Sequence, residues 1–290
     1  MNIEYRILNI KQQVIDSVRD ELAGIYPEKE IDSLVRILFR HYVKSSLPIF
    51  LYDIEISAEE EMQIFAAIEE LKKYRPIQYI LGETEFYGLP VEVNSGVLIP
   101  RPETEELADH IVRMYDKNAA LSIVDIGTGS GCIAVALKVN FPNATVWGLD
   151  VSEQALLVAE RNASKNGVAI NYLLRDALKG DMMGFERETL DVVVSNPPYV
   201  TPSDALQMHA NVLEYEPHIA LFTPENEPLI FFTHIASFAE KSLRNGGRIF
   251  FEINEAFHEE VAYILQQHNF SDILPQRDIN GKWRMIFGKK

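Results

Sequence analysis

The sequence has very little cysteine and no long apolar run. Its only cysteine among 290 residues is Cys132, which excludes an intrachain disulfide and argues against a zinc site built from thiolates. No run of about 18 consecutive apolar residues exists, so no transmembrane helix is expected. The first residues lack a basic segment followed by an apolar core, so no signal peptide is expected. These absences predict a cytoplasmic protein without a metal centre.

Clustered positive charge is also missing. The 27 Lys and Arg residues are outnumbered by 43 Asp and Glu residues, and the formal net charge is −16. Proteins that bind duplex nucleic acid usually gather Lys and Arg on one face. The short basic groups at 72–75 and 289–290 are typical of a solvated helix end and a tail. The composition therefore argues against nucleic acid as a direct partner.

Apolar residues recur at helical spacing in the first part of the chain. The patterns at 7–22 and 31–42 each predict an amphipathic helix. Ser57 and Glu60 have the spacing of a capping box, so a third helix should begin there. We therefore predict a helical domain over residues 1–85. Such apolar stripes usually form only a core, and the functional alternative is a docking module for a macromolecule.

The pattern changes twice after the helical region. Residues 86–100 combine alternating apolar residues with Gly and Pro, which predicts a β-hairpin linker. From residue 121, strand and helix patterns alternate, which indicates an α/β domain over 101–290 with a mostly parallel sheet. The last strand should pair through a hairpin and run antiparallel. The seven expected strands are 121–126, 144–149, 170–174, 190–195, 247–253, 271–275 and 283–288, and the expected helices are 130–139, 152–165, 225–243 and 255–268.

A glycine-rich turn follows the first strand of this domain. Glycines at alternate positions let the backbone approach a ligand closely. The turn is not the dinucleotide fingerprint, because Cys132 stands where the third glycine should be, and this argues against a nucleotide-dependent oxidoreductase. Cys132 itself is expected to be a small helix residue rather than a nucleophile. A tight structural turn is the alternative to a cofactor loop, whose candidate contacts are Asp125, Gly127, Thr128, Gly129, Ser130 and Gly131.

Acidic residues end the next two strands. Asp150 lies where a carboxylate accepts hydrogen bonds from ribose hydroxyls in such sheets. Asp176, followed by Ala177, ends the third strand and could accept from an exocyclic adenine amine. A lone Asp at a strand end is more often a helix cap or a loop acid. Because ligands of open α/β sheets bind at the carboxyl ends of strands, the acids together with the glycine loop predict a nucleoside-binding edge.

The segment Asn196-Pro197-Pro198-Tyr199 turns abruptly after a strand rich in β-branched residues. Its two prolines fix φ and remove two backbone donors. The Asn196 side chain has one carbonyl acceptor and an NH2 group, and the proline carbonyls add further acceptors. An ordinary Asn-Pro turn is the simplest interpretation, but the buried strand before it favours a rigid corner that holds a planar NH2 group.

Together these residues resemble class I S-adenosylmethionine-dependent methyltransferases. The nearest resemblance is to the protein-(glutamine-N5) methyltransferases that modify peptide-chain release factors, and it covers essentially the whole chain. It implies a seven-stranded Rossmann-like domain preceded by a helical substrate-recognition domain. Two positions depart from the family pattern, which usually has glycine at Asn254 and often an aromatic residue at Ala177. The resemblance is carried by the segments 76–82, 99–105, 124–133, 195–200, 215–217 and 220–221.

The resemblance implies a reaction and its participants. S-adenosylmethionine would donate a methyl group to the glutamine of the Gly-Gly-Gln motif in class I release factors. The Asn196 side-chain oxygen and the Pro197 carbonyl would accept the two amide N–H groups, and Tyr199 would pack against the amide plane. Asn196 would also contact the cofactor, and Pro198 and Arg101 would complete the substrate site. A monomer is expected.

Three other hypotheses of function fit parts of the sequence. A nucleobase methyltransferase would use the same corner on an exocyclic amine, but the acidic charge opposes it. A glutamine of a ribosomal protein is an alternative substrate. A non-catalytic binding module would show damage to the glycine loop or to Asn196, and neither is damaged.

Overall fold

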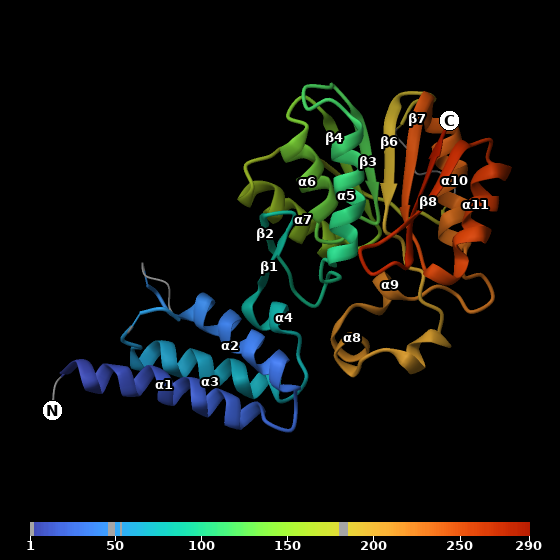
Figure 1. Ribbon diagram of the computed structural model, residues 1–290. Helices are drawn as coiled ribbons and strands as arrows, with labels where there is room; N and C mark the ends of the chain where they lie inside the picture. The colour runs from blue at the N-terminus through green and yellow to red at the C-terminus, as the bar shows by residue number, and fades with distance from the viewer. Residues whose placement is uncertain (1–2, 46–49, 53, 180–184) are drawn as a thin grey trace. The chain divides into compact units, whose positions relative to one another are not determined.

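The chain divides into two compact units, and the boundary in the sequence lies between Leu81 and Gly82 (Figure 1). The computed structural model describes residues 3–45, 50–52, 54–179 and 185–290. The first unit is helical, and the second holds all of the named strands. The hairpin starts at Glu83, earlier than the predicted 86, and therefore belongs to the second unit. No helix within the described ranges is long and apolar enough to span a lipid bilayer.

The helical unit packs around its own apolar core. Buried residues of three helices meet in it, among them Leu22, Phe39 and Ile68. The capping box is confirmed, because the Glu60 backbone N–H donates to Ser57 Oγ over 3.2 Å and the Ser57 N–H donates to Glu60 Oε2 over 2.9 Å. The helices are α1 (Ile3–Leu22), α2 (Glu28–Tyr42), α3 (Ala58–Leu71) and the short α4 (Ile77–Leu81).

The second unit opens with the hairpin and continues into one seven-stranded sheet. The hairpin pairs β1 (Glu83–Phe86) with β2 (Leu89–Glu92). The sheet order is β5-β4-β3-β6-β7-β9-β8, which confirms the predicted class I methyltransferase fold. All neighbours from β5 to β7 are parallel and β9 is antiparallel, as predicted. The strands are β3 (Ser122–Ile126), β4 (Thr145–Asp150), β5 (Asn171–Leu174), β6 (Leu190–Ser195), β7 (Leu243–Glu252), β8 (Ser271–Arg277) and β9 (Trp283–Lys289).

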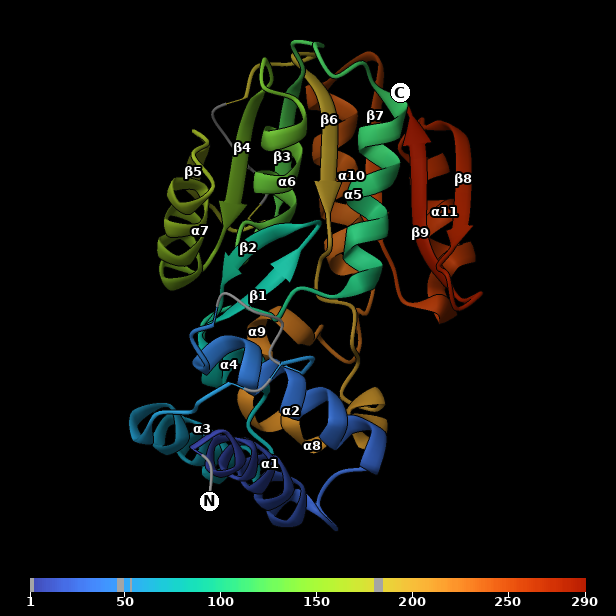
Figure 2. The same ribbon diagram turned by 60° about the vertical axis from the view of Figure 1, so that its left-hand side comes forward.

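Helices cover both faces of the sheet (Figure 2). The helices α5 (Pro102–Met114), α6 (Cys132–Asn140) and α7 (Glu153–Lys165) lie on one face. The helices α10 (Ile230–Ser242) and α11 (His258–Gln267) lie on the other. Helix α10 starts five residues later than the predicted 225. The central strands β3 and β6 are buried on both faces, which explains their continuous apolar sequences.

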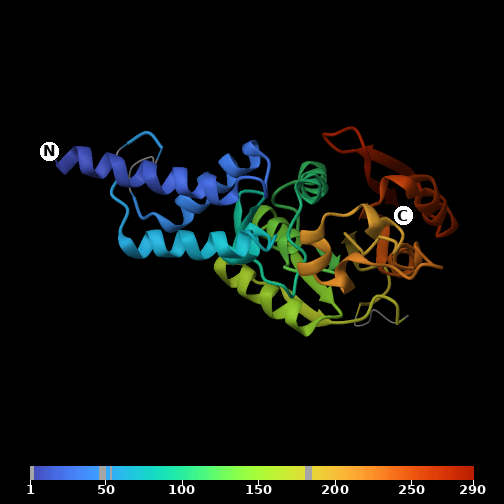
Figure 3. The ribbon, with the colours of Figure 1, turned by 90° about the horizontal axis from the view of Figure 1, so that it is seen from below.

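One segment at the carboxyl edge of the sheet was not predicted from the sequence. It follows β6 and contains η1 (Asp204–Gln207), α8 (Ala210–Tyr215) and α9 (His218–Leu221). An isolated bridge between Val200 and Phe222 joins its two ends. The segment lies below the ends of β6 and β7 (Figures 1 and 3). These elements are too short to show a helical apolar period, which is why the sequence pattern did not reveal them.

Candidate active site

A hollow of about 260 Å³ lies at the carboxyl edge of the parallel strands. The loops after β3, β4, β5 and β6 reach it, because parallel strands end at the same edge of a sheet. Eight residues predicted for the site line this hollow, which we name the edge hollow: Gly127, Gly129, Asp150, Asp176, Ala177, Asn196, Pro197 and Pro198. The structure thus brings together residues that are up to 71 positions apart in the sequence.

The glycine loop turns tightly between β3 and α6. Its three glycines have φ values of 71°, 55° and 77°, a region that L-residues with a side chain rarely adopt. Gly127 and Thr128 both donate their backbone N–H to the Leu149 carbonyl, over 2.8 and 2.9 Å. The loop is therefore anchored on β4, with Gly127 and Gly129 facing the edge hollow.

Four predicted cofactor residues do not line the edge hollow. They are Asp125, Thr128, Ser130 and Gly131, and Thr128 Oγ1 donates to Asp125 Oδ2 over 2.6 Å. The Ser130 carbonyl accepts a 2.9 Å hydrogen bond from Asn162 Nδ2 on α7. These contacts fasten the loop to β3 and α7, so direct contact of these four residues with a cofactor stays a prediction.

Asp125 is a carboxyl group in a fully buried position. Burial raises its pKa to about 7, although the hydrogen bond from Thr128 opposes this shift. A carboxyl whose pKa is higher in the folded chain than in the unfolded chain stabilises the fold most when it is protonated. Its contribution is complete below about pH 4 and is lost as the pH rises through about 7.

We expect Asp125→Asn to remove this part of the pH dependence. The measured quantity is the free energy of unfolding of the unsubstituted protein minus that of the variant. This difference should fall between pH 4 and pH 8 by a few kcal/mol, on the order of 1.4 kcal/mol per pKa unit. Urea denaturation of both proteins at four pH values measures the difference. Asp20→Asn, at an exposed position of α1, serves as the control, and its difference should change less over this pH range than that of Asp125→Asn. A flat difference for Asp125→Asn would contradict the prediction.

Asp150 ends β4 and faces the edge hollow. Its Oδ2 accepts from the Gly129 N–H and its Oδ1 from the Ser152 N–H, both over 2.9 Å. The Val151 backbone N–H also interacts with this carboxylate. A carboxylate has about four acceptor positions, so about one stays available. Burial raises the pKa of Asp150. This carboxylate can accept a hydrogen bond from a hydroxyl, such as one of a ribose.

The residues after β5 form another part of the wall of the edge hollow. Asp176 Oδ1 accepts from the Leu178 N–H over 2.9 Å, so the residue closes a turn, which was the simpler of its two interpretations. It nevertheless lines the edge hollow beside Ala177. The apolar wall around them was not predicted and comes mainly from Val151, Leu178, Phe231 and Ile235.

A second hollow of about 270 Å³ lies next to the first, and we name it the corner hollow. Both hollows are lined by Leu98, Asn196, Pro197 and Ala220. Tyr199 and Arg101 line only the corner hollow. The Asn196-Pro197 corner therefore forms part of the wall of both spaces.

Two buried side chains, Thr104 and Glu252, hold this corner through hydrogen bonds. Asn196 Nδ2 donates to Thr104 Oγ1 over 3.2 Å, and Thr104 Oγ1 donates to Glu252 Oε2 over 2.6 Å. Tyr199 Oη donates to Glu252 Oε1 over 2.9 Å. Burial raises the pKa of Tyr199 far above that of a free phenol, so its hydroxyl stays neutral and cannot act as a base near pH 7.

Thr104 and Glu252 were not predicted as site residues from the sequence. Glu252 carries a usable signal, since it is a strand-end acid like Asp150 and lies in the apolar stretch 249–253. Thr104 has no such signal, because a threonine in the first turn of a helix is common.

Arg101 is the N-cap of α5 and lines the corner hollow. Its guanidinium forms an ion pair with the buried Glu216, and Glu216 Oε2 also accepts from the Ile99 N–H over 3.1 Å. The pair ties the start of α5 to the segment after α8. A structural role therefore exists beside the predicted role in substrate binding.

Two other residues singled out from the sequence have structural explanations. Cys132 is the buried first residue of α6, and burial raises its pKa to about 12. The thiol stays protonated at neutral pH, which disfavours a nucleophile. Asn254 has an ordinary φ of −69° and its side chain caps η2 (Glu255–Phe257), so no glycine is required there.

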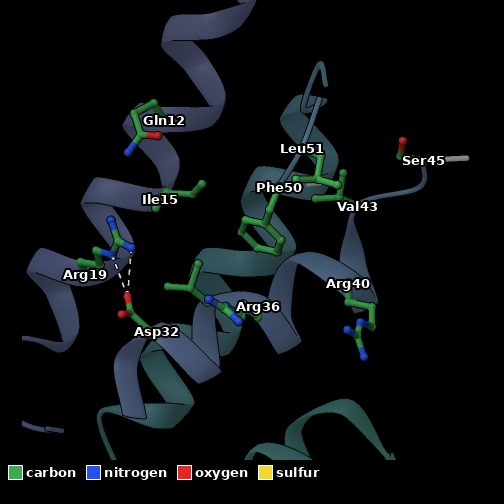
Figure 4. Close-up of a pocket in the computed structure, with 11 residues that line it drawn as sticks. Gln12, Ile15, Arg19, Asp32, Arg36, Arg40, Val43, Ser45, Phe50 and Leu51 are labelled. Atoms are coloured by element: carbon green, nitrogen blue, oxygen red, sulfur yellow. Dashed lines mark hydrogen bonds and ion pairs between the residues drawn. The ribbon is translucent and has the colours of Figure 1, made fainter. Parts of the chain in front are cut away.

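A separate groove of about 690 Å³ lies within the helical unit (Figure 4). Arg19, Arg36 and Arg40 line it together with Phe50 and Leu51. Arg19 Nη2 pairs with Asp32 Oδ1 over 2.9 Å. Arg36 and Arg40 are exposed residues of α2. The groove thus combines cationic and apolar side chains on a strongly acidic chain.

Comparisons with known proteins cover both units. Residues 13–82 match the family described as the PrmC N-terminal domain, and residues 104–215 match the Methyltransferase small domain. The release factor glutamine methyltransferase of Flavobacterium psychrophilum is 41% identical over 97% of this chain and 98% of its own length. That of Bacteroides thetaiotaomicron is 39% identical, over 93% and 96%. Among solved structures, a methyltransferase from Pyrococcus furiosus has a TM-score of 0.51 at 18% identity, covering 81% of this chain and 99% of that chain, which supports the fold.

Proposed function

Because this chain belongs to the release factor glutamine methyltransferases, we propose that its Asn196-Pro197-Pro198-Tyr199 corner holds a glutamine side-chain amide during methylation. The enzyme is S-adenosylmethionine-dependent, as its family is. That cofactor supplies an electrophilic methyl group on a sulfonium sulfur. The residues of the chain must therefore hold the methyl donor on one side of the corner and the amide nitrogen on the other.

We assign the edge hollow to the cofactor. Asp150 has an acceptor position left for a ribose hydroxyl, and Gly127 and Gly129 leave space beside the loop because neither has a side chain. Asp176 offers a carboxylate near the apolar residues Leu178 and Phe231, which suit an adenine ring and its amine. With Ala177 too small to stack on the ring, these apolar neighbours would supply the contact.

The observation that carries the proposal is the shared wall of the two hollows. Asn196 and Pro197 line both of them. A glutamine in the corner hollow and a cofactor in the edge hollow would then meet at this wall. Reacting atoms must be held about 3–3.5 Å apart and in line, and a shared wall is where two ligands can approach so closely.

The corner can activate the amide through hydrogen bonds alone. An amide nitrogen is a weak nucleophile, because its lone pair is delocalised into the carbonyl. Asn196 Oδ1 and the Pro197 carbonyl would accept its two N–H groups, orient the nitrogen and favour the positive charge that develops on it. No dedicated base is needed, since the methylated nitrogen becomes acidic and loses a proton afterwards. Tyr199 would pack on the amide plane and help exclude water.

The substrate is then the glutamine of the Gly-Gly-Gln motif in a class I release factor, acted on in the cytoplasm by a monomeric enzyme. Transfer of labelled methyl to a release factor, followed by mass mapping, tests this. The label should appear on that glutamine and disappear when the glutamine is replaced by alanine. DNA, RNA and ribosomal proteins are the parallel acceptors, and label on one of them alone would establish an alternative instead.

The helical unit would bind the release factor away from the reacting glutamine. Its groove carries Arg36 and Arg40 beside the apolar Phe50, which suits an acidic segment that also has apolar side chains. Charges at the rim of an interface mainly affect association rather than chemistry. The contribution of the groove should therefore be seen with whole release factor and not with a short peptide.

We expect Arg40→Glu to raise KM for the whole release factor about fivefold, since an exposed ion pair contributes up to ~1 kcal/mol. The turnover number should stay unchanged, and kinetics on a short peptide containing Gly-Gly-Gln should not respond. Lys29→Glu makes the same charge change on α2 at an exposed position that does not line the groove, and it is the matched control. Equal effects of the two variants would refute docking in the groove.

A further inference from the structure

We propose that Thr104 and Glu252 are positioning residues that hold the Asn196 amide with its oxygen toward the substrate. The inference rests on the proposed function, in which Asn196 Oδ1 accepts a hydrogen bond from the glutamine amide. Asparagine can turn its amide by 180° and present NH2 in place of oxygen. The direction of this one side chain therefore decides whether the corner can accept the substrate N–H.

The fold places these three residues together from distant parts of the chain. In the parallel pair of β6 and β7, Ser195 lies opposite Phe251. The next residues are Asn196, just after β6, and Glu252, the last residue of β7, and they therefore lie side by side. Helix α5 brings Thr104 from its first turn to the same point. Thr104 is 3% exposed and Glu252 is 1% exposed, so water competes little for their hydrogen bonds.

The number of available protons fixes the direction of the chain of hydrogen bonds. Both oxygens of Glu252 are acceptors, one from Tyr199 Oη over 2.9 Å and one from Thr104 Oγ1 over 2.6 Å. The second distance is typical of a hydroxyl that donates to a carboxylate. A hydroxyl has one hydrogen. Because Thr104 donates this hydrogen to Glu252, its oxygen can only accept a hydrogen bond from Asn196. Asn196 must then turn its NH2 toward Thr104, which leaves Oδ1 for the substrate.

The ionised form of Glu252 is required for this direction. Burial raises the pKa of Glu252 above that of a free glutamate, and the hydrogen bonds from Thr104 and Tyr199 and the Arg284 guanidinium oppose this rise only in part. A Glu252 protonated on Oε2 would donate to Thr104 and release the threonine hydrogen toward Asn196. The amide would then turn its oxygen to Thr104 and its NH2 to the corner hollow, where two donors would face each other.

The test is a double-mutant cycle of Thr104→Val and Asn196→Ala in the full chain. Single-turnover transfer of labelled methyl to a Gly-Gly-Gln peptide is measured for each protein. Thr104→Val removes the hydroxyl at nearly constant volume and should lower the transfer rate about tenfold, the size of one net hydrogen bond. KM and cofactor affinity should change less than twofold. Thr104→Ser, which keeps the hydroxyl, should restore most of the rate.

The cycle separates positioning from a general structural role. If Thr104 acts through Asn196, Thr104→Val should have no further effect when residue 196 is already alanine. Equal effects of Thr104→Val in both backgrounds would overturn the inference and leave the proposed function standing. An unchanged rate for Asn196→Ala would instead overturn the proposed function itself.

Glu252→Gln provides a second route should Thr104→Val fold poorly. Glutamine has one acceptor oxygen where Glu252 has two, so the side chain can no longer accept from both Thr104 and Tyr199. The rate should again fall about tenfold, and again only when Asn196 is present. A rate equal to that of the unsubstituted protein, in a variant that binds the cofactor normally, would overturn the inference.

Discussion

Asn196→Ala is expected to lower methyl transfer a hundred- to a thousandfold, the usual cost of removing one aligned hydrogen-bonding group from a reacting centre. The variant loses the acceptor that orients the amide nitrogen, while the Pro197 carbonyl remains. Since Asn196 forms only part of the wall of the edge hollow, the affinity for S-adenosylmethionine should change by no more than a few fold. Steady-state transfer to release factor and calorimetric titration of the cofactor measure the two quantities.

The matched control for this variant is Asn143→Ala. Asn143 is an exposed residue of the same unit and donates to the Asn118 carbonyl over 3.1 Å, so its replacement removes a hydrogen bond outside the site. Its turnover should equal that of the unsubstituted enzyme. Two results would refute the assignment of Asn196, namely unchanged turnover of Asn196→Ala or a parallel loss of cofactor binding and turnover.

Gly131→Ala is expected to destabilise the second unit and to weaken cofactor binding strongly. Gly131 caps α6 with φ of 77°, and a Cβ at this position would lie 2.9 Å from Ala159 Cβ and 3.0 Å from Tyr172 Oη. Left-handed backbone costs an alanine about 1–2 kcal/mol, and overpacking in a filled interior costs about 1–3 kcal/mol more. Relief of the contact requires the glycine loop or α7 to move, and the loop lines the edge hollow.

Gly167→Ala separates these two contributions. Gly167 follows α7 with φ of 67°, and a Cβ there meets nothing within 4 Å. This variant should lose only the backbone part, roughly 1–2 kcal/mol, with unchanged cofactor affinity. Urea denaturation should therefore show a larger loss for Gly131→Ala by about 1–3 kcal/mol. Similar losses for both variants would mean that the contact with Ala159 and Tyr172 carries no cost.

Local sequence chemistry predicted much of this protein. The capping box of α3 depends on two residues three positions apart, and the structure forms it as expected. The β-branched stretch before Asn196 and the alternate glycines after β3 each depend on neighbouring residues, so both elements were predicted where they occur. The last strand was predicted to join by a hairpin and run antiparallel, and β8 and β9 pair in this way. The identity of the reaction came from motifs of this kind.

Only the tertiary structure decided the contacts between residues that are far apart in the chain. Thr104 and Glu252 are 148 positions apart, yet they share a hydrogen bond that controls the direction of Asn196. Arg101 and Glu216 pair across 115 positions. The sequence also could not divide the glycine loop into Gly127 and Gly129, which face the edge hollow, and Thr128 and Ser130, which fasten the loop.

The physical reason is that the two kinds of information have different ranges. Backbone preference, capping and turn chemistry act over a few residues, so the sequence by itself determined most of the helices and strands, the glycine loop and the Asn196-Pro197-Pro198-Tyr199 corner. The direction of a buried amide depends instead on which donors and acceptors the sheet register and α5 bring within about 3 Å of it. Only the packed fold therefore decided that Asn196, which lines the corner hollow, turns its nitrogen to Thr104.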